Sequence, residues 1–206
     1  LALGIMIYNF ALFVVPWLDE FAVSRSTVML AILFFQVMTG LISPFIGLLL
    51  DKYTMRLLVV FGAICMGVGL FFLSLATEFW QVVVIYTFVL PVSMLLTGTL
   101  ASQTMISKWF TTQRSLAIGL SAMGTSIGGL LIPLVTSMLI EHYAWQGALL
   151  VLAVGSLVIL VPINLLILRI EPPLQGVASQ KSSDPYQRIW TSKEILSSSA
   201  FWIPVI

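Results

Sequence analysis

Six long apolar runs dominate this chain, and no Asp, Glu, Lys or Arg lies inside any of them. They cover residues 1–15, 26–50, 57–76, 80–107, 115–140 and 145–168. A helix that crosses a bilayer needs about 20 mostly apolar residues, and its backbone groups must pair within the segment. We therefore expect an all-α, polytopic membrane protein with six spanning helices, the first of them incomplete. A β-barrel would instead show short alternating segments.

Composition narrows the class of protein further. The chain is 60% hydrophobic and 8% charged, whereas soluble domains are about one quarter charged. We expect no nucleic-acid partner, because no basic cluster is present. The single cysteine, Cys65, lies in an apolar run, and no metal-ligand spacing occurs. An intramembrane enzyme would need ionisable groups within its spans, so we expect no enzyme, no cofactor and no metal.

The ends of the chain and its last polar stretch predict the domain organisation. The stretch 169–200 holds Pro172, Pro173 and Pro185 and is read as a central loop. Residues 201–206 resemble the start of a seventh span. The chain starts without Met inside an apolar run. We expect it to be the amino-terminal half of a longer protein, with a six-helix bundle at 1–168 and a missing carboxy-terminal half.

Basic residues predict the orientation in the membrane. Alternate connections carry eight of them, namely Lys52, Arg56, Lys108, Arg114, Arg169, Lys181, Arg188 and Lys193. The other connections carry Arg25 alone, beside four acids, Asp19, Glu20, Glu78 and Glu141. Cytoplasmic loops are enriched in Lys and Arg. We therefore expect a multi-pass protein of the cell (inner or plasma) membrane, with the central loop 169–200 in the cytoplasm and the lipid bilayer as its solvent.

The connection between the second and third runs has the clearest motif. It places a glycine, an acid and two basic residues at Gly47, Asp51, Lys52 and Arg56. This spacing resembles the signature of the major facilitator superfamily, although Thr54 stands where glycine is usual. The resemblance implies a twelve-helix fold, of which this chain is the amino-terminal bundle, built from two inverted three-helix repeats. It also implies a cytoplasmic gate at these four residues. The alternative is a turn with ordinary positive-inside charges.

The fifth run indicates a branch of that superfamily. Its glycines and proline, Gly119, Gly124, Gly128 and Pro133, follow Trp109 and Arg114. This pattern resembles the oxalate/formate antiporter and monocarboxylate porter branch. The four residues are expected to serve helix packing and gating, because small faces let membrane helices approach closely. Ile132 stands where an antiporter motif has glycine, and packing without gating stays open.

Polar residues on the first and fourth runs are candidates for a substrate pathway. Tyr86, Ser93 and Thr97 are spaced seven and four, so they project within one arc of a helix. Tyr8 and Asn9 are the matching pair on the first run. In the resembled fold these two helices line the central cavity. The alternative is that the hydroxyls bond carbonyls of their own helix.

These observations favour a secondary active transporter that moves a small solute by alternating access. The branch resemblance implies an organic anion such as a monocarboxylate or dicarboxylate, and a coupling ion such as a proton. A second hypothesis is a drug or metabolite exporter of the same superfamily. A third is a sensor or scaffold derived from a transporter.

Overall fold

A computed structural model describes residues 4–109 and 114–167. These residues belong to one compact unit, Leu1–Glu171. The expected central loop 169–200 and the expected start of a seventh span at 201–206 lie outside the described residues. The part of the chain that the structure describes is helical and contains no β-strand.

Local backbone features mark the end of the first span and the start of the second. The first consists of a π-helix, η1 (Gly4–Tyr8), and α1 (Phe10–Phe21), which ends where Ala22 turns left-handed with φ 48°. Helix α2 (Arg25–Lys52) starts at Ser24, whose side chain accepts a hydrogen bond from the Thr27 amide. Helix α3 spans Met55–Ser74. The first span therefore runs six residues beyond the expected residue 15.

The fourth span is a chain of short helices. It comprises α4 (Phe79–Val84), η2 (Ile85–Val89), α5 (Leu90–Thr97) and α6 (Thr99–Trp109). The π-helical turn ends just before Pro91, which has no amide hydrogen to donate to the preceding turn. A second irregularity follows at Gly98, where φ is −91° and ψ is −149°. This residue separates α5 from α6.

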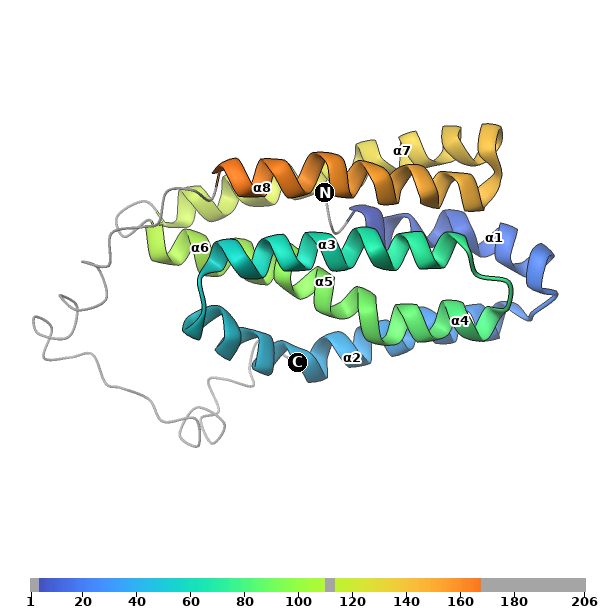
Figure 1. The fold of residues 1–206 in the computed structure, drawn as a ribbon, viewed down its shortest axis with the longest axis horizontal. Coiled ribbons are helices and arrows are strands. Elements are labelled where there is room, and N and C mark those ends of the chain that lie inside the picture. The colour runs from blue at the N-terminus through green and yellow to red at the C-terminus, as the bar shows by residue number, and fades with distance from the viewer. Residues whose placement is uncertain (1–3, 110–113, 168–206) are drawn as a thin grey trace, which may run out of the picture. The chain divides into compact units, whose positions relative to one another are not determined.

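One long helix contains the fifth span and the first part of the sixth. Helix α7 (Arg114–Gly155) continues into η3 (Ser156–Leu160) and α8 (Val161–Ile167). Ala144 is not helical, with φ 56° and ψ 179°, and Figure 1 shows the chain turning back on itself within α7. The apolar run Ser115–Leu166 has 52 residues, about 78 Å as a straight helix, against a hydrocarbon core of roughly 30 Å. The reversal at Ala144 divides it into two spans.

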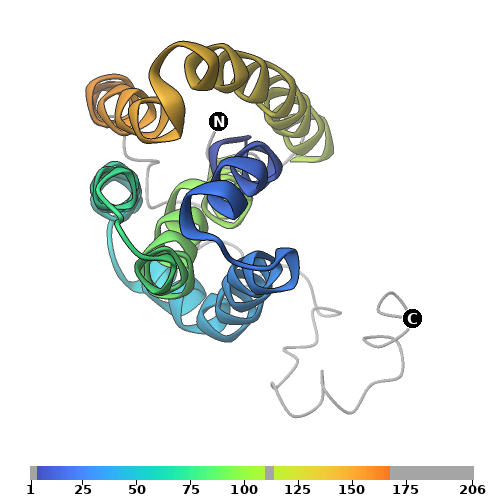
Figure 2. The ribbon, with the colours of Figure 1, turned by 90° about the vertical axis from the view of Figure 1, so that its right-hand side faces the viewer.

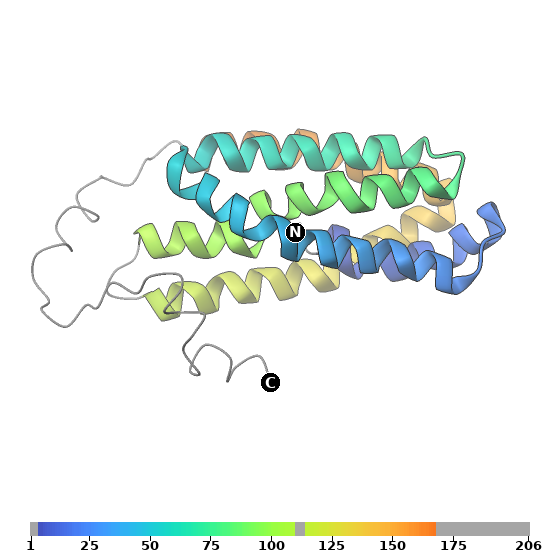
Figure 3. The ribbon, with the colours of Figure 1, turned by 90° about the horizontal axis from the view of Figure 1, so that it is seen from below.

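The helices lie side by side along one axis (Figures 1 and 3). Viewed along that axis in Figure 2, α1 lies in the middle, with α3 and α4 on one side and the first part of α7 on the other. An aromatic core joins the first, second and fourth spans and includes Phe13, Trp17, Phe35 and Tyr86. A smaller core at the other end includes Leu50, Leu58 and Leu96.

The outer surface of the bundle is apolar as well. Large side chains such as Phe45, Leu116 and Leu130 are at least 70% exposed. Exposure of such a surface to water is unfavourable, whereas lipid chains are as apolar as leucine. The bundle is therefore a polytopic, all-α membrane protein.

Candidate functional site

The turn between α2 and α3 carries the predicted gate residues. Asp51 and Lys52 form the end of α2, and Arg56 lies in the first turn of α3, all three exposed. The Lys52 ammonium lies 5.9 Å from the centre of the Tyr53 ring. A methyl group added at Gly47 would meet no atom within 4 Å among the described residues. The surface of α2 at Gly47 is thus open to a further helix.

The predicted packing glycines of α7 divide into two groups. Gly128 lies against the first span, because a methyl group added at Gly4 would be 2.6 Å from the Gly128 carbonyl oxygen. The neighbouring Gly129 supports the Tyr8 ring, whose Cε2 lies 2.9 Å from the position of an added methyl group. Gly119 and Gly124 have no such neighbour within the described residues. Small residues therefore permit a close crossing of the first and fifth spans at one place.

Pro133 lies inside α7, one turn beyond this crossing. Proline cannot donate the hydrogen bond that the carbonyl four residues earlier would accept, and that carbonyl belongs to Gly129. The helix nevertheless continues through Pro133 to Tyr143. This stretch of α7 thus combines a close helix contact with the loss of one backbone hydrogen bond.

Asn9 is completely buried and ties the same two spans together. Its Nδ2 donates to Thr136 Oγ1 at 2.8 Å, and Thr136 Oγ1 donates to the Ile132 carbonyl at 2.8 Å. Asn9 Oδ1 is buried without a hydrogen-bond partner in the described part of the chain. The side chain of Asn9 thus faces the inside of the bundle, while Tyr8 beside it is 51% exposed.

Tyr86 lies at the centre of the aromatic core and is only 2% exposed. Its ring meets the Phe10, Trp17 and Phe35 rings edge-on, with centroids 5.4, 5.8 and 6.1 Å away. Edge-to-face pairs of this kind stabilise aromatic clusters. Tyr86 therefore joins the first, second and fourth spans.

Ser93 and Thr97 form hydrogen bonds within their own helix. Ser93 Oγ donates to the Leu90 carbonyl at 2.8 Å, and Thr97 Oγ1 donates to the Ser93 carbonyl at 2.7 Å. Ser93 is fully buried, with its hydroxyl 3.8 Å from Met6 Sδ. The hydroxyls at these positions thus donate their hydrogen bonds to carbonyls of their own helix, as hydroxyls in membrane helices commonly do.

A polar pocket that sequence reasoning missed lies between α6 and α7. It has a volume of about 230 Å³ and is lined by Thr99, Gln103, Ile118, Ser121, Ala122, Thr125 and Ser126. Five of these seven side chains carry a hydroxyl or an amide. The pocket begins directly after the helix break at Gly98. The available signal was Gln103, an amide inside an otherwise apolar run, together with the hydroxyls one turn apart on α7.

The pocket lies between helices that are long and apolar enough to cross a membrane, and ligand sites commonly occur between the helices of a bundle. The whole chain, residues 1–206, matches the family model described as Major Facilitator Superfamily. The chain belongs to this superfamily.

The curated relatives agree with this assignment. The uncharacterized MFS-type transporter YcxA of Bacillus subtilis (strain 168) is 24% identical over 176 residues, which are 85% of this chain and 43% of YcxA. The agnestins efflux protein AgnL12 of Paecilomyces divaricatus is 36% identical over 48% of this chain and 23% of its own length. Monocarboxylate transporter 12-B of Danio rerio is 32% identical over 55% of this chain and 24% of its own length. The matched segment is less than half of each relative.

Proposed function

We propose that this chain forms one half of a secondary active transporter that moves a small organic anion, a monocarboxylate or dicarboxylate, by alternating access. A second six-helix bundle completes the pathway, and a coupling ion such as a proton drives it. The protein works as a transporter and not as an enzyme. It resides in the cell membrane with residues 169–200 in the cytoplasm. Superfamily membership and a relative named as a monocarboxylate transporter support this proposal.

The polar pocket between α6 and α7 carries the proposal. Its hydroxyls and the Gln103 amide lie within spans that contain no charged residue. Hydroxyl and amide groups donate hydrogen bonds to carboxylate oxygens, and such charge-assisted bonds are among the stronger ones. In this structure, Thr125 and Ser126 donate to carbonyls of α7 at 3.2 Å.

We assign roles in transport to the remaining predicted residues. Asp51, Lys52 and Arg56 latch the cytoplasmic side by pairing with groups across the interface, and Gly47 lets the second bundle approach α2. Tyr8, exposed on the first span, faces the pathway. The buried Asn9, Tyr86 and Ser93, and the half-buried Thr97, shape the pathway wall from behind. Gly119 and Gly124, open on α7, are further positions at which the second bundle slides.

A second candidate function is the export of a metabolite. Relatives named as efflux proteins for agnestins and fujikurins favour it. An exporter of bulky, weakly charged compounds would use the same hydroxyl and amide groups without any need for a carboxylate. The two functions therefore differ in their solute and not in the architecture of this bundle.

Transport by the complete protein in liposomes separates these possibilities. We expect labelled carboxylates to be taken up, and Gln103→Leu to lower uptake about tenfold, because a hydrogen bond to a charged group contributes about 1.5–3 kcal/mol. Ser126→Ala tests the pocket on α7. Ser137→Ala is its matched control, since Ser137 also bonds a carbonyl of α7 but does not line the pocket.

Two outcomes would count against the proposal. Unchanged carboxylate uptake in both Gln103→Leu and Ser126→Ala would remove the pocket from the pathway. Movement of lipophilic cations or neutral metabolites, with no carboxylate uptake by the wild type, would favour the exporter.

A further inference from the structure

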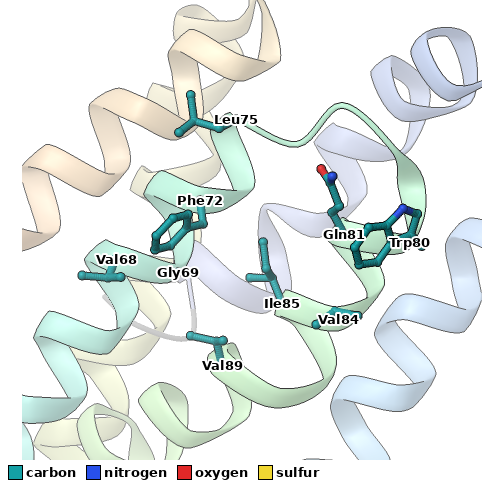
Figure 4. A pocket seen from close by; sticks show the side chains of 9 residues that line it. All are labelled: Val68, Gly69, Phe72, Leu75, Trp80, Gln81, Val84, Ile85 and Val89. Atoms are coloured by element: carbon teal, nitrogen blue, oxygen red, sulfur yellow. The ribbon is translucent and has the colours of Figure 1, made fainter.

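A second groove lies between α3 and the first part of the fourth span, far from the polar pocket. It has a volume of about 460 Å³ and is lined mainly by apolar side chains, among them Val68, Phe72 and Leu75 on α3 (Figure 4). Val84 and Ile85 face them from the fourth span. The two helices touch at the inner end, where a methyl group added at Gly69 would be 3.0 Å from Val89 Cγ1. They separate toward the connection at Thr77–Glu78.

The groove opens to the outside of the bundle. Val68, Phe72 and Val84 are 40%, 57% and 43% exposed. Viewed along the bundle, α3 and α4 lie on the side opposite the first part of α7, with α1 between them (Figure 2). In a chain that crosses a bilayer, such an exposed apolar face meets lipid chains. An unfilled groove would forfeit the dispersion contacts of its lining, so an acyl chain is the natural occupant.

The open end of the groove has the chemistry of the membrane interface. Trp80 is 60% exposed, and its Nε1 donates to Glu78 Oε2 at 2.7 Å. The Thr77 amide donates to Gln81 Oε1 at 2.9 Å. Tryptophan concentrates where hydrocarbon meets headgroups. From Gly69 to Leu75 the groove runs about 9 Å along α3, a length that fits the part of an acyl chain nearest its headgroup.

The charges at this end select the headgroup. Glu78 is the one charged residue between positions 57 and 107. In Figure 1 the α1–α2 connection, the α3–α4 connection and the reversal within α7 lie at the same end of the bundle. Among the described residues, the first of these segments carries Asp19, Glu20 and Arg25, and the reversal carries Glu141. This surplus of negative charge repels an anionic headgroup and attracts an ammonium group. The Trp80 ring adds a favourable face for a cation.

We propose that this groove is a lipid site, which holds one acyl chain of a phospholipid whose headgroup carries a primary ammonium, as in phosphatidylethanolamine. The ammonium bonds the Glu78 carboxylate beside Trp80, and the acyl chain lies between Phe72 and Val84. The site is separate from the solute pathway and does not depend on which solute the protein carries.

Quenching of tryptophan fluorescence by brominated lipids tests the site in the full chain reconstituted in bilayers. The Trp80 signal is the difference between wild type and Trp80→Phe. We expect phosphatidylethanolamine brominated near the headgroup end of its chains to quench this signal about fivefold more effectively than brominated phosphatidylglycerol, because one charge at the membrane surface contributes about that factor.

Two variants separate headgroup from acyl chain. Glu78→Gln keeps an acceptor for the Trp80 indole but removes the charge that bonds the ammonium, so the preference for phosphatidylethanolamine should decrease. Val84→Phe fills the groove and should lower quenching of Trp80 by every brominated lipid. Val158→Phe is its control, since Val158 is exposed but lies elsewhere, in η3. Equal quenching by both lipids in the wild type, or unchanged quenching in Val84→Phe, would overturn the proposal.

Discussion

The Asn9 side-chain amide donates a 2.8 Å hydrogen bond to the Thr136 hydroxyl, and both residues are completely buried. They are 127 positions apart in the chain, so the bond joins the first span directly to the fifth. The contact of Gly4 with Gly128 lies on the same two spans. A close backbone approach and a buried polar bond therefore fix one helix crossing together.

We predict that this bond contributes measurably to the stability of the bundle. Asn9→Leu and Thr136→Val each remove one partner at nearly constant volume. Hydrogen bonds between membrane helices contribute about 0.6 kcal/mol on average and up to about 1.7. A double-mutant cycle on unfolding in detergent or bicelles should give a coupling energy within that range. Ser137→Ala, at an exposed serine, should have no coupling with Asn9→Leu, and strictly additive effects of the main pair would contradict the bond.

The glycine contact gives a second prediction. Gly4→Ala places a methyl group 2.6 Å from the Gly128 carbonyl oxygen, and a backbone atom cannot move aside cheaply. We expect a loss of about 1–3 kcal/mol in unfolding free energy, as for other overpacked sites. Gly124→Ala is the matched control, because its added methyl group meets no described atom within 4 Å. That control should be neutral or slightly stabilising, since alanine favours helices. Equal losses in both variants would be inconsistent with the contact.

Sequence periodicity predicted the helices well and their crossings poorly. Charge-free runs of about 20 residues are long enough to require helix in lipid, and among the described residues each run coincides largely with observed helix. The spacing of the three glycines on α7 places Gly124 and Gly128 on one face of the helix and Gly119 on the opposite face. It does not say where a neighbour crosses that face, because the crossing point depends on how the two helices tilt. Only Gly128 among the three lies under the first span.

The polar pocket was hidden for a related reason. Thr99 and Gln103 lie one turn apart on α6, and Ser121 and Thr125 lie one turn apart on α7, so each helix supplies only part of the polar lining of the pocket. The pocket begins just after Gly98, a break in the helix that separates α5 from α6. A lone glycine in a strong helical pattern does not reveal such a break. In contrast, the stripe of Tyr86, Ser93 and Thr97 was visible in the sequence because all three residues belong to one span.

Variants of Tyr86 can distinguish a role of this residue in packing from a role in transport. Tyr86→Ala removes a ring that meets three others and should cost about 3–5 kcal/mol of stability. Tyr86→Phe keeps the ring and should retain nearly all of that stability. Solute affinity of the complete protein should then report on the hydroxyl alone. Reduced affinity in Tyr86→Phe would give the hydroxyl a role in the pathway, and wild-type affinity would leave packing as the role of this residue.

Asp51 tests the proposed gate. Asp51→Asn removes the charge but keeps the size of the side chain, so the protein should still insert and fold. We expect transport by the complete protein to fall at least tenfold, because the latch depends on a charge at the membrane boundary. Expression and thermal unfolding should match the wild type. Wild-type transport rates in this variant would refute the latch.

Sidedness can be measured at two exposed positions on connections at opposite ends of the bundle. Arg56 follows the turn after α2, and Glu78 precedes α4. Single cysteines at these positions, in a Cys65→Ser background, should react differently with a membrane-impermeant maleimide. The surplus of basic residues on the connections that include Arg56 predicts a cytoplasmic location there. We therefore expect Glu78→Cys to react in intact cells and Arg56→Cys to react only after permeabilisation. The reverse pattern would invert the proposed topology and place the groove beside Trp80 in the cytoplasmic leaflet.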